Sequence, residues 1–68
     1  MKKWAYVICE LCDEHGKPTT KTIAEGGMPS FRHTFVEAED ASGAYKAGHH
    51  KLRQPRGNGL NDYVFELP

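Results

Sequence analysis

The sequence predicts an α+β fold: a small, mostly antiparallel sheet of about four strands, with one helix packed on it, in the order β-β-β-α-β. Short segments rich in β-branched and aromatic residues alternate with breaks that contain glycine and proline. One later segment instead repeats apolar residues every three to four positions, which is typical of an amphipathic helix. With 68 residues and no internal repeat, the chain is expected to form a single domain, residues 1–68.

The first predicted strand is Trp4–Leu11, with the sequence WAYVICEL. Side chains alternate between the two faces of a strand. One face would carry Ala5, Val7, Cys9 and Leu11, and the other would carry Trp4, Tyr6 and Ile8. Because both faces are apolar, we expect a strand that is covered on both sides, by the helix on one and by a second subunit on the other.

Two further strands are predicted before the helix. The composition of Asp13–Pro18 is typical of a turn, and the β-branched residues of Thr19–Ala24 predict a partner strand. After a glycine-containing break, residues Phe31–Ala38 predict the third strand. His33 lies in it between two phenylalanines, and we expect this imidazole to face the core.

The predicted helix occupies Glu39–Gln54, and Asp40 is a suitable N-cap. Its apolar stripe consists of Ala41, Ala44, Tyr45, Gly48 and Leu52. Glycine is unfavourable inside a helix, so Gly48 suggests a close approach of the helix to the sheet. Pro55 should end the helix near Arg53. A glycine-containing loop and a last strand, Leu60–Leu67, complete the fold.

The most suggestive short motif is CELCDEH, Cys9–His15, which pairs C-x-x-C spacing with a histidine. In a strand, residues three apart point to opposite faces and their Cα atoms lie about 10 Å apart, too far for a disulfide. A zinc site or a redox pair would require the strand to stop near Cys9. We expect the motif to be the end of the first strand, and we predict no metal and no cofactor.

Charge and hydropathy limit the class of protein. Nine basic residues balance nine acidic ones, which disfavours general nucleic-acid binding. The apolar run that follows MKK is too short for a signal peptide, and no segment has the length of a membrane span. We therefore expect a cytoplasmic protein with reduced thiols and no membrane association.

Basic residues concentrate between Lys46 and Arg56, with no acidic residue among them. Several share one side of the predicted helix, and the following loop offers backbone N–H groups to an anion. The candidate ligand-binding residues are Lys46, His49, His50, Arg53, Arg56, Gly57, Asn58 and His33. Cations near a helix C-terminus also have a purely structural explanation, because they favour the helix dipole.

The leading functional hypothesis is a non-enzymatic binding protein that holds a small anionic ligand, such as a nucleotide, at a site shared between subunits. By analogy with phage counter-defence proteins, such a module could sequester a signalling molecule. The first alternative is a protein-interaction module with an exposed apolar patch formed by Trp4, Tyr6 and Ile8. The second is single-stranded nucleic-acid binding through His33, Phe35 or Tyr45 as stacking platforms.

Overall fold

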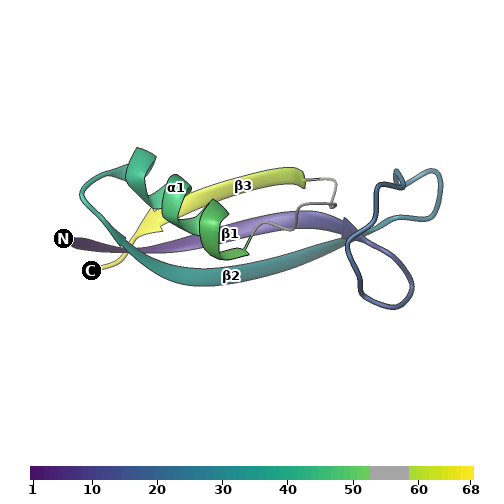
Figure 1. The fold of residues 1–68 in the computed structure, drawn as a ribbon, viewed down its shortest axis with the longest axis horizontal. Coiled ribbons are helices and arrows are strands. Elements are labelled where there is room, and N and C mark those ends of the chain that lie inside the picture. Colours follow the sequence, from purple (N-terminus) through teal and green to yellow (C-terminus); the bar gives the residue numbers. More distant parts are fainter. Residues whose placement is uncertain (53–58) are drawn as a thin grey trace.

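The computed structural model describes residues 1–52 and 59–68 and confirms the α+β class (Figure 1). The elements are β1 (Lys2–Cys12), β2 (Met28–Ala38), α1 (Ala41–Leu52) and β3 (Gly59–Glu66). The observed order is therefore β-β-α-β, with a three-stranded sheet in this part of the chain. The prediction of about four strands was wrong by one strand, which lies before β2.

The missing strand is Thr19–Ala24, which forms part of the connection from β1 to β2. Thr22 and Glu25 close a local turn there: the Thr22 backbone N–H and hydroxyl donate to Glu25 Oε1 at 3.1 and 3.0 Å. These hydrogen bonds hold the pKa of Glu25 below its ordinary value. Side chains that bond their own backbone compete with sheet pairing. Gly26, with a φ of 109°, then reverses the chain.

The sheet has the strand order β2-β1-β3, and both pairs are antiparallel. Strand β1 is therefore the central strand, a position that the sequence analysis did not predict. The register with β2 runs without interruption from Lys2↔Ala38 to Cys12↔Met28. The register with β3 shifts between Cys9 and Glu10. Both chain ends lie at the same end of the sheet, opposite the β1–β2 connection (Figure 1).

Helix α1 begins as predicted, because Asp40 Oδ1 accepts a hydrogen bond from the Gly43 backbone N–H at 2.9 Å. The close approach expected at Gly48 is also confirmed. A Cβ atom added to Gly48 would lie 2.1 Å from Cγ of Tyr6, so only glycine lets the helix reach this ring. Gly48 and Ala44 are the buried residues of the helix.

The core lies between α1 and one face of β1. Trp4, Tyr6 and Ile8 are all buried there, and Tyr6 has no exposed surface. The Trp4 indole donates a hydrogen bond to the Ala38 carbonyl at 3.0 Å. The exposed patch that one hypothesis assigned to these three residues is therefore the core. Among the described residues, no helix combines the length and the apolar character needed to cross a membrane.

Candidate functional site

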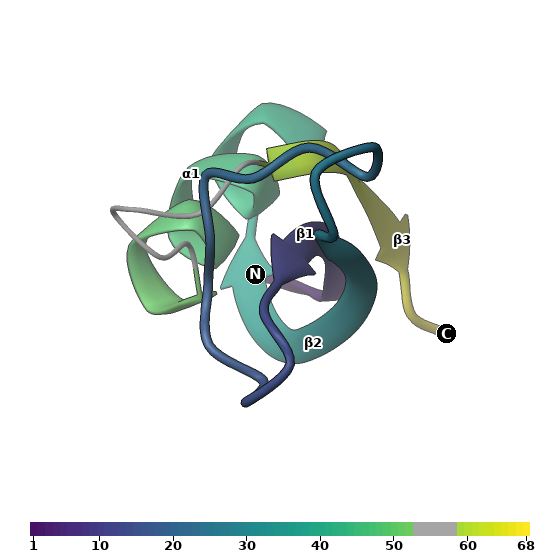
Figure 2. The ribbon, with the colours of Figure 1, turned by 90° about the vertical axis from the view of Figure 1, so that its right-hand side faces the viewer.

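The face of the sheet opposite α1 carries the largest concentration of exposed aromatic residues. Helix α1 lies on one side of the sheet only (Figures 1 and 2). On the other side, Phe35 and Phe65 are both registered with Ala5, while His33 and Tyr63 are both registered with Val7. Residues directly opposite each other in antiparallel strands point to the same face. These side chains therefore share one surface.

We call this surface the aromatic face and define it by Phe31, His33, Phe35, Tyr63 and Phe65, together with Ala5, Val7 and Cys9. Phe31, Phe35 and Phe65 are 67%, 59% and 54% exposed. Apolar residues scattered singly on a surface are ordinary, but contiguous apolar patches usually mark an interaction site.

The strand register and the side-chain sizes predict a trough along the aromatic face. Its two walls stand on the edge strands, where the rings of His33 and Phe35 lie 5.8 Å apart and those of Tyr63 and Phe65 lie 5.1 Å apart, both edge to face. Between the walls lies the central strand, which contributes the half-buried side chains Ala5 and Val7 and, farther along, the buried Cys9. Two strand spacings, about 9.6 Å, separate the walls. This width suits a single row of bulky side chains.

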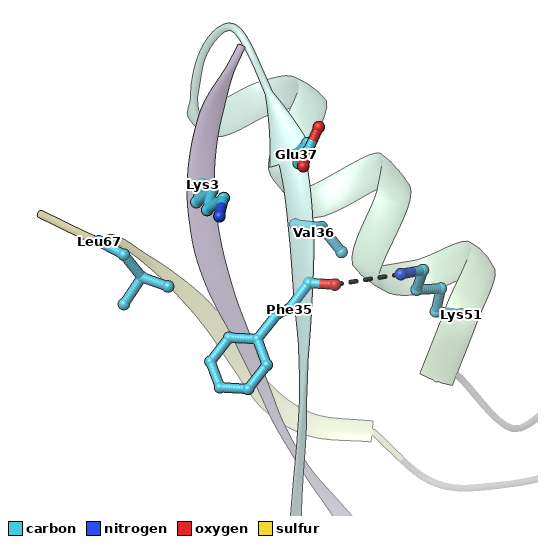
Figure 3. Close-up of a pocket in the computed structure, with 6 residues that line it drawn as sticks. All are labelled: Lys3, Phe35, Val36, Glu37, Lys51 and Leu67. Carbon is cyan, nitrogen blue, oxygen red and sulfur yellow. Dashed lines mark hydrogen bonds between the residues drawn. The ribbon is translucent and has the colours of Figure 1, made fainter.

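One end of the aromatic face opens into a cavity of about 660 Å³ (Figure 3). The cavity is lined by Lys3, Phe35, Val36, Glu37, Lys51 and Leu67. Phe35 and Leu67 point away from α1, whereas Lys51 reaches from α1 and donates to the Phe35 carbonyl at 3.1 Å (Figure 3). Lys3 and Glu37 are registered with each other, so this end of the sheet pairs opposite charges.

His33 belongs to the aromatic face and is exposed, which corrects the expectation that its imidazole faces the core. The alternation of strand β2 explains the difference. Val36 and Ala38 are buried beneath α1, so the odd-numbered residues of the strand must point away from it. The sequence did not reveal which of the two apolar faces the helix would select.

The structure places only part of the predicted anion site. Lys46 and His50 are exposed on α1. Arg53, Arg56, Gly57 and Asn58 lie outside the described residues. Binding of an anionic ligand by this segment therefore stays a prediction.

His49, the remaining member of the predicted cluster, faces the sheet. Its Nε2 contacts Asp62 Oδ2, and the Tyr6 hydroxyl donates to the same oxygen at 2.8 Å. The His49 ring also lies edge to face against Tyr6, with centroids 5.5 Å apart. These contacts connect α1, β1 and β3, so in this structure His49 helps to position the helix.

A second polar connection lies at the C-terminal end of α1. Glu10 is only 4% exposed, and its Oε1 contacts Arg32 Nη2. The same guanidinium nitrogen donates to the Leu52 carbonyl at 2.6 Å, which satisfies one of the last helix carbonyls. Within the described part of the chain, Glu10 Oε2 has no hydrogen-bond partner. Arg32 is therefore the described partner of this buried side chain.

The residues of the Cys9–His15 motif do not come together in the structure. Strand β1 continues through Cys12, so Cys9 and Cys12 point to opposite faces, and both are free thiols. His15 lies in the following turn, where its backbone N–H donates to Asp13 Oδ1 at 2.8 Å. Hydrogen bonds from the backbone N–H groups of Lys17 and His15 hold the pKa of Asp13 below its ordinary value. In residues 1–52 and 59–68, no three His, Cys, Asp or Glu side chains gather as a metal site would require.

Sequence reasoning missed the aromatic face as a unit. The signal was present as two alternating patterns, Phe31–Phe35 and Tyr63–Phe65, in which every second residue is aromatic or imidazole. Recognising one surface required the pairing of both strands with β1. Comparison with models of known protein families, with curated proteins and with solved structures finds no match to this chain.

Proposed function

We propose that this chain is a non-enzymatic protein-interaction module and that the aromatic face is its interaction surface. The observation that carries the proposal is the exposure of three phenylalanines on the one sheet face that α1 leaves open. Aromatic residues are enriched at the centre of protein interfaces, where they are the commonest energetic anchors. Pre-packed walls reduce the ordering cost of binding, because these rings already contact one another.

Charge favours a protein partner over a nucleic acid. The chain has no net charge, and the aromatic face itself carries no lysine or arginine. Lys3, at its end, is registered with the acidic Glu37. Single-stranded nucleic acids bind where stacking residues line a positively charged groove. The protein-interaction module, the first alternative in the sequence analysis, is therefore retained with a different surface from Trp4, Tyr6 and Ile8.

Site-specific photo-crosslinking tests the proposal. The photoreactive residue benzoyl-phenylalanine would replace Phe35 or Phe65 in the full chain expressed in cells, with replacement of the exposed Lys46 on α1 as the matched control. We expect protein adducts from positions 35 and 65 and none from position 46. Equal yields from all three positions, or adducts that nuclease digestion removes, would contradict the proposal.

A further inference from the structure

We infer that the occupant of the aromatic face is a second copy of this chain, bound face to face about a two-fold axis parallel to the strands. The inference rests on the proposed function and names its partner. The axis would pass midway between β1 and β2, so that β2 of each copy lies over β1 of the other. Such an interface is isologous, because the same surface serves both copies.

The register of the sheet makes this arrangement self-complementary. A two-fold axis between β1 and β2 exchanges the two strands, so each β2 residue of one copy lies over its own register partner in the other copy. Phe35 would cover Ala5, and His33 would cover Val7, both of which are half-buried in the single chain. Both pairs set a large side chain over a smaller one, which is the pattern that lets two sheets interdigitate.

The trough shape supports the same placement. The β2 wall of one copy would enter between the β2 and β3 walls of the other, where the floor is formed by small residues. Direct stacking of β1 on β1 would instead leave an empty space between the two floors. Protein interfaces are packed as densely as protein interiors, so the offset arrangement is favoured.

Charge complementarity is an independent argument for a two-fold axis between β1 and β2. Lys3 and Glu37 are exposed and registered with each other at one end of the aromatic face. The same axis would place Lys3 of each copy over Glu37 of the other, and would do so twice. A two-fold axis perpendicular to the strands, or one that passes over β1 itself, would not place Lys3 over Glu37 of the other copy. Both cross-copy ion pairs would then be lost. Complementary rim charges set the register of an interface more than they set its affinity.

The area is sufficient for a weak dimer. A covered aromatic side chain buries about 150–250 Å², so the exposed parts of the three phenylalanines represent on the order of 350 Å² per chain. With the remaining residues of the face, two copies would bury on the order of 1,000 Å², near the lower limit for a specific interface. We therefore expect a dimer that dissociates on dilution.

A charge-exchange experiment tests the inference. Lys3→Glu places like charges across the two-fold axis, and Glu37→Lys does the same with the opposite sign. A mixture of the two variants, one of them isotopically labelled, restores both cross-copy pairs only in the heterodimer. We expect native mass spectrometry to show the heterodimer at least about fivefold above either homodimer. The matched control is the mixture of Lys2→Glu with Glu66→Lys, an exposed pair 3.6 Å apart outside the aromatic face, which should show no preference.

The failures of the two proposals are distinguishable. A wild-type monomer at every concentration in sedimentation velocity, or a charge-exchange mixture without preference, overturns the second-copy inference. If photo-crosslinking at Phe35 then yields another protein, the interaction module stands with a different partner. If it yields no protein adduct, the interaction module fails as well. Circular dichroism of each charge variant confirms that it is folded, as expected for substitutions at exposed positions.

Discussion

The two faces of this sheet are built by alternate residues of the same strands, and they differ in exposure rather than in apolar content. On the helix side, Trp4, Tyr6 and Ile8 are at most 8% exposed. On the aromatic face, Phe31 and Phe35 are 67% and 59% exposed. The chain thus carries apolar residues on both faces, whereas one helix, in residues 1–52 and 59–68, covers one of these faces. A small domain gains little stability from a single covered face, which makes a cover for the second face valuable.

Loss of Arg32 should have the largest effect on the helix side. Arg32→Ala leaves the buried Glu10 carboxylate without its described charge partner and removes the contact to the Leu52 carbonyl. We expect the free energy of unfolding to fall by about 3–5 kcal/mol, measured by urea denaturation. The double variant Glu10→Leu with Arg32→Leu should be closer to wild type, because no buried charge is left behind. A single variant as stable as the double variant would show that Glu10 does not need this partner.

A methyl group at Gly48 should push α1 away from the face of β1 that it covers. The added Cβ atom would overlap the Tyr6 ring, so Gly48→Ala should lower the free energy of unfolding by about 1–3 kcal/mol despite its better helix propensity. Gly43→Ala is the matched control, because its Cβ atom would lie 3.2 Å from Ala38 Cβ rather than inside a ring. If both substitutions stabilise the protein equally in thermal denaturation, the close approach of α1 to Tyr6 is not maintained in solution.

An anionic ligand should stabilise the protein if the sequence hypothesis for the basic segment is correct. ATP or tripolyphosphate at about ten times its dissociation constant would add about 1.4 kcal/mol to the free energy of unfolding. The paired substitution Arg53→Ala with Arg56→Ala should abolish the resulting rise in Tm. Lys2→Ala, a basic side chain on another element, provides the control. Absence of any rise with wild-type protein would remove this hypothesis.

Substitutions on the aromatic face should change self-association rather than the stability of the single chain. Phe35→Ser changes an exposed side chain, so the dilute protein should lose no more than about 0.5 kcal/mol of unfolding free energy. The Tm of the wild type should instead rise with protein concentration, because association stabilises the folded state, and Phe35→Ser should remove that dependence. Thr20→Ser, at an exposed position in the β1–β2 connection, should retain it. A wild-type Tm that is independent of concentration would contradict association through this face.

The local features of the fold followed from neighbouring residues. Asp40 was identified as the helix N-cap because a short carboxylate side chain reaches the backbone N–H groups of the next turn. Gly48 was predicted to mark a close approach because glycine is unfavourable inside a helix and this one lies in the apolar stripe. Thr19–Ala24 was mistaken for a strand because β propensity is weak where a threonine can bond its own turn, as Thr22 does with Glu25.

By itself, the sequence determined the α+β class and the place where the helix begins, since both depend on periodicity or on contacts within a few residues. Only the tertiary structure decided which apolar face of β1 the helix covers, and therefore that Trp4 is core while His33 is exposed. It also brought together Phe35 and Phe65, thirty residues apart along the chain, through their common partner Ala5. The alternation of side chains shows which residues share a face of the strand. Which face the helix covers depends on how the side chains pack between helix and sheet, and a local pattern does not contain that information.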